Sequence, residues 1–187
     1  MTDKNVSIMN IGSMGYLPQV FKKIENEKKL NIVYLGGSIT MGCNATKTEL
    51  RYVDRSAKWW QTNFPDAEIS YFNAGIGATT SQFGVARVQE HVLDKQPDLV
   101  FVEFSVNDSS SPLFMETYES LVRRLLKAES VKAVVLINNL FYDTGTNAQG
   151  IHNAIGLHYD LPIVSVRNYI FCLLYTSPSP RDRSVSR

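Results

Sequence analysis

The sequence predicts an α/β fold, a three-layer α/β/α sandwich around a parallel five-stranded sheet with strand order 2-1-3-4-5. Apolar runs rich in β-branched and aromatic residues recur along the chain, and the segments between them carry apolar residues at helical spacing. Strands that are apolar along their whole length need helices on both faces, and alternation with helices gives parallel strands joined by right-handed crossovers. The strand order is a common one in doubly wound sheets.

The expected elements follow one another in a regular order. Strands are predicted at residues 32–35, 69–72, 99–104, 133–137 and 161–166. Helices are predicted from four apolar stripes: Leu17, Val20, Phe21 and Ile24; Val53, Ala57, Trp60 and Phe64; Val85, Val88 and Val92; Met115, Tyr118, Leu121, Leu125 and Leu126. Neither a repeat nor a linker divides them. We therefore expect one domain over residues 1–171, then a non-native or disordered tail over residues 172–187, because a Ser/Pro/Arg-rich segment cannot pack.

The composition excludes several classes of partner. The 187 residues are 44% hydrophobic, enough for a substantial core, and 19 basic against 18 acidic side chains leave a net charge of +1. This balance provides no field that gathers polyanions, so neither a nucleic acid nor a membrane is expected as a partner. Two cysteines, Cys43 and Cys172, do not make a disulfide framework. With no signal peptide and no apolar run of about 18 residues, a cytoplasmic location is expected.

Three polar turns follow the first three predicted strands. Ser38 stands in Gly36-Gly37-Ser38-Ile39 after the first strand, the turn at residues 73–78 follows the second, and Asn107 follows the third. With this strand order the carboxyl ends of the three strands lie side by side, about 4.8 Å apart, so the turns are expected to meet at one crevice. A serine there is a candidate nucleophile, and backbone N–H groups and an Asn amide are candidate donors to an oxyanion.

Simpler roles for these residues stay open. Ser38 can be a polar turn residue, and Asn107 can cap its loop together with Asp108. The glycines before Ser38 favour the nucleophile, because they let a substrate carbonyl approach the backbone closely.

Nucleotide binding finds no support in the glycine-rich turns. The third glycine of a GxGxxG motif would fall at Thr80, and the P-loop spacing that begins at Gly37 has Cys43 and Asn44 where lysine and a hydroxyl residue are required. No cofactor is expected. What remains is a turn whose N–H groups can point into the crevice, which is the property an oxyanion hole needs.

The three turns together resemble a known family. Residues 36–40, 73–81 and 102–108 are similar to the first three blocks of the SGNH hydrolases, also called GDSL-type esterases and lipases, and the likeness spans about residues 15–170. The resemblance implies a flavodoxin-like fold and metal-free deacylation of esters of sugars, lipids or other small alcohols. The first block, with its Gly-Gly-Ser sequence, resembles that of a bacterial subgroup which includes carbohydrate deacetylases. The resemblance therefore implies a small-molecule acyl ester as the substrate, such as an acetylated carbohydrate.

The same resemblance implies roles for individual residues. Ser38 would be the nucleophile, and the oxyanion hole would consist of the Ser38 N–H, a backbone N–H of the second block and the Asn107 side chain. The family has glycine at the second-block donor, and matching this sequence to it puts the donor at Ala78, with Gly77 as the adjacent candidate.

The base that a serine nucleophile requires is missing from the sequence pattern. The family takes it from a DxxH motif near the C-terminus, and none of His91, His152 and His158 has an aspartate three residues before it. His91 is expected to lie within a helix, at the surface or partly packed. His152 and His158 are expected to pack in the core or to lie at a helix end. Loss of the histidine costs on the order of a millionfold in turnover in subtilisin. Residues 172–187 are similar to translated adaptor or vector sequence, so we expect a chain that is incomplete at its C-terminus, a natural disordered tail being the alternative.

These observations favour a serine ester hydrolase that is close to inert in this form. The alternatives are a noncatalytic ligand-binding domain that keeps the crevice and a nonfunctional fragment that folds poorly. Tyr52, Trp59 and Trp60 either help to shape a sugar-binding face or pack their helix.

Overall fold

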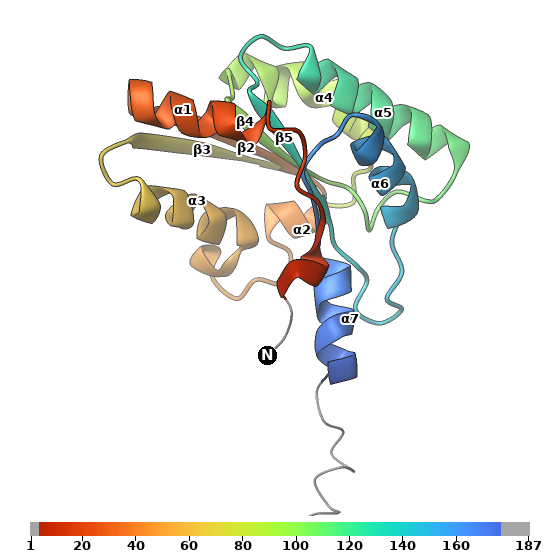
Figure 1. Ribbon diagram of the computed structural model, residues 1–187. Coiled ribbons are helices and arrows are strands. Elements are labelled where there is room, and N and C mark those ends of the chain that lie inside the picture. Colours follow the sequence, from red (N-terminus) through yellow and green to blue (C-terminus); the bar gives the residue numbers. More distant parts are fainter. Residues whose placement is uncertain (1–3, 177–187) are drawn as a thin grey trace, which may run out of the picture.

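One mixed sheet organises residues 4–176, which are the residues described by the computed structural model (Figure 1). Its strand order is β1-β6-β5-β4-β2-β3, and only β1 runs antiparallel to its neighbour. The strands are β1 (Ile8–Asn10), β2 (Lys29–Gly36), β3 (Glu68–Gly75), β4 (Leu99–Glu103), β5 (Ala133–Asn138) and β6 (Ile163–Ser165). The helices are α1 (Leu17–Glu27), α2 (Ser38–Met41), α3 (Tyr52–Asn63), α4 (Ser81–His91), α5 (Pro112–Leu126), α6 (Gln149–His158) and α7 (Val166–Thr176).

Alternating side chains of the central strands build two separate cores. Ile32 and Tyr34 of β2 pack with α1 and α3 on one face of the sheet. Val33 and Leu35 of the same strand pack with α4, α5 and α6 on the other. Strands buried on both faces need apolar residues at every position, which is why β2, β4 and β5 appear in the sequence as continuous apolar runs.

The predicted sheet is confirmed in class and in order. The five predicted strands correspond to β2, β3, β4, β5 and β6, and their spatial order is the predicted 2-1-3-4-5. The register aligns Gly36 with Gly75 on one side and with Glu103 on the other, so the first three strands end level with one another. The turns that follow them are therefore neighbours.

The predicted number of strands was wrong by one, because the sheet has six strands. The edge strand β1 pairs with β6 through Ile8 and Asn10. This strand is only three residues long and largely exposed, so it makes no apolar run. Its pairing with β6 is made by backbone groups, which leave no trace in the side-chain pattern.

The C-terminal part of the chain continues as helix. Residues 172–176, the first part of the predicted tail, belong to α7, and residues 177–187 lie outside the described range. Within residues 4–176, no helix is long and apolar enough to cross a membrane, and no disulfide joins Cys43 to Cys172.

Candidate active site

Ser38 is the first residue of the single-turn helix α2, which follows β2 after one intervening residue, Gly37. Gly37, immediately before it, packs so closely against Asn107 that a Cβ there would come within 2.5 Å of the Asn107 Oδ1. Only glycine fits this approach. The side chain of Asn107, which is 69 positions further along the chain than Ser38, therefore lies directly against the turn that carries the serine.

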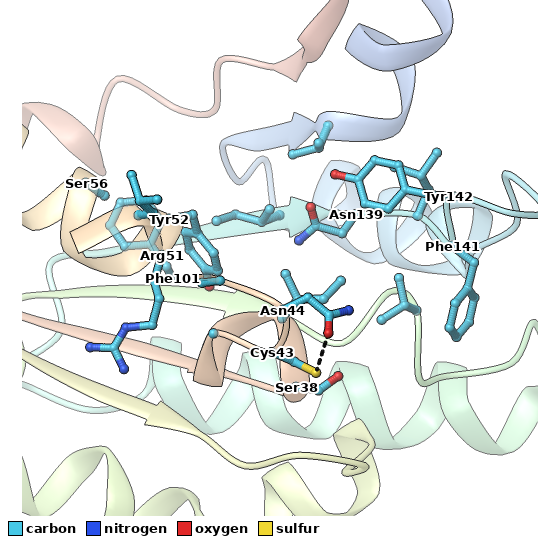
Figure 2. A pocket seen from close by; sticks show the side chains of 18 of the residues that line it. Ser38, Cys43, Asn44, Arg51, Tyr52, Ser56, Phe101, Asn139, Phe141 and Tyr142 are labelled. Carbon is cyan, nitrogen blue, oxygen red and sulfur yellow. Dashed lines mark hydrogen bonds between the residues drawn. The ribbon is translucent and has the colours of Figure 1, made fainter. Parts of the chain in front are cut away.

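The Ser38 hydroxyl is half-buried and has no hydrogen-bond partner among residues 4–176. Its backbone is fixed all the same, because the Ser38 carbonyl accepts the N–H groups of Gly42 at 3.0 Å and Cys43 at 2.9 Å. The residue lines a cavity of about 1000 Å³. Figure 2 shows it beside Cys43 and Asn44, with the hydroxyl not engaged by either.

The end of β3 is bonded to α2, and the loop that follows it is bonded to the end of β2. The Asn73 Nδ2 donates to the Thr40 carbonyl at 2.8 Å, the Asn73 Oδ1 accepts the Gly75 N–H at 2.9 Å, and the Ile76 N–H bonds the Gly36 carbonyl at 3.1 Å. One asparagine thus connects the second turn to the helix that begins at the serine.

Gly77 and Ala78 follow in that loop. Ala78 is exposed and has φ of 57°, a left-handed conformation that costs a non-glycine residue about 1 kcal/mol or more. A glycine would adopt this conformation without strain, which accounts for the glycine expected at this position. Neither the Ser38 N–H nor those of Gly77 and Ala78 bond an acceptor within the described part of the chain.

Asn107 places its side-chain amide group against the turn that carries Ser38. Its backbone N–H bonds the Phe104 carbonyl at 3.0 Å, and its Oδ1 is buried without a donor. The Nδ2 makes no hydrogen bond to residues 4–176 and is not a buried atom, so it is the end of the side chain that a ligand can reach. Ser38, the turn at residues 77–78 and Asn107 are the predicted site residues, and the structure brings these three segments together.

Arg87 is a buried cation that the sequence reasoning missed. From α4 its Nη1 donates to the Ala74 carbonyl at 2.7 Å and its Nη2 to the Gly36 carbonyl at 3.0 Å, so it connects the ends of β3 and β2. Burial lowers its pKa to about 10. Its place next to Val88 in an otherwise apolar stripe is the signal that it is not a surface arginine.

A buried carboxyl group, Glu103, lies at the end of β4 beneath the serine turn. Its backbone carbonyl accepts the Gly37 N–H at 3.3 Å, and its Oε1 accepts both the N–H and the hydroxyl of Ser105 at 3.1 Å. Burial raises the pKa of Glu103 to about 7, because the charged form loses its hydration. The polar network therefore extends from the serine turn to the loop after β5, where the Asn139 N–H donates to the Ser105 hydroxyl at 2.7 Å.

The aromatic residues of α3 divide between two roles. Tyr52 lines the cavity and its hydroxyl is 2.8 Å from the Thr40 Oγ1. Trp60 is buried and stacks on Phe64 with centroids 5.7 Å apart, and Trp59 is exposed but does not line the cavity. Of the three candidates for a sugar-binding face, only Tyr52 contributes to the wall.

None of the three histidines lines the cavity. His152 is fully buried, with its Nε2 3.1 Å from the Asp108 Oδ2 and its ring stacked on Tyr118. Burial lowers the pKa of His152, and the nearby Asp108 carboxylate opposes that shift. His91 contacts Arg87 from the end of α4.

The second oxygen of Asp108, Oδ1, accepts the Ser81 N–H at the start of α4 at 2.9 Å. The Asp108–His152 pair therefore holds α4 and α6 to the β4 loop, a contact between distant segments that the local sequence does not reveal. His158 is the last residue of α6 and is exposed, and His152 is the histidine of this helix that packs.

Within the described residues, the arrangement offers an unbonded serine hydroxyl and unbonded hydrogen-bond donors on adjacent turns, and no histidine lines the cavity. Donors around a serine can stabilise the charge that develops on an attacked carbonyl oxygen. Among residues 4–176, no group of three or more His, Cys, Asp or Glu side chains is placed to hold a metal ion.

Comparisons with known proteins agree with this geometry. The sequence pattern of the GDSL-like Lipase/Acylhydrolase family matches residues 34–173. No curated protein sequence matches the chain. A two-domain esterase (CEX) active on acetylated mannans has a crystal structure that matches this chain with 43% sequence identity and a TM-score of 0.89. The structure of this esterase co-crystallised with mannopentaose matches with 43% identity and a TM-score of 0.90. The matches cover 97% of this chain and 49% and 50% of those chains, so this chain spans about half their length.

A more distant structure shares the fold alone. A catalytic mutant of Axe2, an acetylxylan esterase from Geobacillus stearothermophilus, is 20% identical with a TM-score of 0.64, over 80% of this chain and 81% of that one.

Proposed function

The chain belongs to the GDSL-like lipase/acylhydrolase family, a family of hydrolases, and on this basis we propose that Ser38 is the nucleophile of a serine ester hydrolase acting on carbohydrate O-acetyl esters. The Ser38 oxygen loses its proton and attacks the acetyl carbonyl carbon, and the ester C–O bond breaks as the sugar oxygen takes up a proton and leaves as a hydroxyl group. Water then hydrolyses the acetyl-serine to acetate and the free serine. The observation that carries the proposal is the unbonded Ser38 hydroxyl at a cavity wall, on a turn whose Gly37 lies against the Asn107 side chain and the Thr79 carbonyl.

The oxyanion is proposed to be stabilised from three sides. The donors are the Ser38 N–H, the N–H of Ala78 or of its neighbour Gly77, and the Asn107 Nδ2. Because these groups already lack partners, they need not break other bonds when the carbonyl oxygen becomes charged, which is the advantage of a preorganised hole.

The acetylated carbohydrate is supported by similarity. The esterase that is 43% identical over nearly the whole of this chain is active on acetylated mannans. We extend to this chain the coarse substrate class, an acetyl ester of a polysaccharide or oligosaccharide.

The proposed turnover of this 187-residue chain is very low. The nucleophile must give its proton to a base, and the only three histidines of the sequence are placed elsewhere. Without an imidazole, what remains is the contribution of the oxyanion hole and of substrate binding.

Chemical rescue tests the proposal. Free imidazole replaces the missing base, and hydrolysis of p-nitrophenyl acetate is followed in its presence with the parent chain and with Ser38→Ala. We expect imidazole to accelerate hydrolysis by the parent chain well above the imidazole-only background and to leave Ser38→Ala at that background. Ser70→Ala, at an exposed serine near the start of β3, should behave like the parent. Equal rates for the parent and Ser38→Ala would refute the nucleophile.

The absence of a histidine beside Ser38 also favours a second candidate, a noncatalytic domain that binds the same ligand in the same cavity. In that case Ser38→Ala would bind acetylated oligosaccharide as the parent does, and imidazole would rescue neither.

A further inference from the structure

Two exposed aromatic side chains project from the loop between β5 and α6. Phe141 is 52% exposed and Tyr142 is 75% exposed. Both line the cavity that Ser38 lines. In the view of Figure 2 they lie on one side of it, with Arg51 and Tyr52 on the other and Ser38 between. Large apolar side chains in contact with water beside a candidate nucleophile require an explanation.

This loop is closed by hydrogen bonds of its own. The Phe141 N–H bonds the Thr146 carbonyl at 3.1 Å, and the Gly145 N–H bonds the Phe141 carbonyl at 2.7 Å. At its base the Ala148 N–H bonds the Ser105 carbonyl at 2.7 Å. The backbone that carries both rings is thus tied to the turn that also carries Asn107.

Helix α7 supports the loop from the opposite side. The Arg167 Nε donates to the Gly145 carbonyl at 2.8 Å, and its guanidinium lies 4.6 Å from the centroid of the Phe171 ring. Gly145 has φ of 67°, and a Cβ there would come within 2.6 Å of that ring. Glycine satisfies both requirements, so Gly145 lets the loop that carries the two aromatic residues pack against α7.

We propose that Phe141 and Tyr142 form a stacking platform for a pyranose ring of the carbohydrate whose acetyl ester reaches Ser38. The inference rests on the proposed function and adds to it the residues that recognise the sugar. An aromatic face is complementary to the C–H groups of a pyranose, and a Phe or Tyr side chain, with two side-chain torsions, loses little entropy on binding.

The rest of the cavity suits a neutral, hydroxyl-rich ligand. The amides of Asn44 and Asn139 and the Asp143 carboxylate line it, and each can bond sugar hydroxyls. Its one basic lining residue in the described structure, Arg51, is paired with Asp54 at 2.6 Å and 3.1 Å, so no free cation is offered to an anionic ligand. A volume of about 1000 Å³ far exceeds the needs of an acetyl group alone.

Calorimetric titration with mannopentaose and with chemically acetylated mannopentaose tests the platform. Each variant is made in the Ser38→Ala chain to prevent turnover. We expect Phe141→Ala and Tyr142→Ala each to weaken binding about tenfold, and Tyr142→Phe, which keeps the ring, to bind within about twofold of the Ser38→Ala chain. Trp59→Ala is the matched control, since Trp59 is also 52% exposed but lies outside the cavity, and it should bind unchanged.

The inference is overturned if Phe141→Ala and Tyr142→Ala bind like the control, or if the Ser38→Ala chain binds neither oligosaccharide. The Phe141 and Tyr142 variants are expected to melt at the same temperature as the Ser38→Ala chain, because both side chains are exposed. Imidazole-rescued hydrolysis of p-nitrophenyl acetate, which has no sugar, separates the two proposals: Ser38-dependent rescue with no platform effect on binding would refute the platform and keep the esterase.

Discussion

Ser38 owes its position to neighbours that approach it through backbone atoms. Gly37 lets Asn107 come within contact distance, and Asn73 bonds α2 to the second turn. The sequence was sufficient to predict which turns would meet, because each follows a strand and the strand order decides adjacency. The sequence did not predict that Arg87, Glu103 and Ser105 form buried hydrogen bonds near the site, because these bonds depend on burial and on partners that are distant in the chain.

A single substitution tests the amide donor. Asn107→Ala removes the Nδ2 group from the proposed oxyanion hole, and loss of one such donor typically costs about 3 kcal/mol of transition-state stabilisation, or about 100-fold in rate. We expect a decrease of this size in imidazole-rescued hydrolysis of p-nitrophenyl acetate.

Asn63→Ala is the control for that measurement, since Asn63 is an exposed asparagine at the end of α3 and should leave the rate unchanged. Rescue of Asn107→Ala at the parent rate would exclude the amide from the oxyanion hole.

At the scale of elements, the site is the common edge where β2, β3 and β4 end. Apolar runs predicted these strands and the covering helices, since a strand buried on both faces has a strong signal. The signal fails for β1, which is short and exposed, and for α7, whose second half has the sequence of a predicted tail. The Arg87 side chain, from α4, connects the ends of β2 and β3 by hydrogen bonds.

Arg87→Met tests that connection. It removes bonds to the Ala74 and Gly36 carbonyls, and we expect the free energy of unfolding in urea to fall by about 2 kcal/mol, because charged hydrogen bonds to buried carbonyls are lost. Arg87→Lys should recover little of the loss, since an ammonium group lacks the fork that reaches two carbonyls. Unchanged stability of Arg87→Met would show that the cost of burying the cation offsets both bonds.

The molecule as a whole covers its two sheet faces unequally. Helices α4, α5 and α6 enclose one core, whereas on the face of α1 and α3 the strand residues Phe101, Ile137 and Val164 line the cavity. The strand order and the two helical layers were predictable from the chain alone. The cavity was not, because it depends on how the loop after β5 and α7 come together.

Glu103 makes the stability of the whole fold depend on pH. Its pKa is raised from 4.5 to about 7 by burial, so the folded state binds this proton more tightly than the unfolded state. The stability that it contributes is therefore complete below about pH 4.5 and is lost as the pH rises to about 7. The loss is on the order of 3 kcal/mol.

Glu103→Gln removes this dependence. We expect the difference in free energy of unfolding between Glu103→Gln and the parent chain to shift in favour of the variant as the pH rises from 5 to about 8, measured by urea unfolding at each pH. His152, whose pKa burial lowers, destabilises the fold as the pH falls below about 6.5, but it does so in both proteins and cancels in the difference. A difference that is constant with pH would contradict the raised pKa of Glu103.

Mapping of the acetylated residue by peptide mass spectrometry, after incubation with p-nitrophenyl acetate and imidazole, tests the central claim most directly. The account predicts an acetyl group on the peptide that contains Ser38, formed more slowly in Asn107→Ala and absent in Ser38→Ala. Acetylation confined to the exposed thiol of Cys43 or to surface lysines, with Ser38 unmodified, would contradict it.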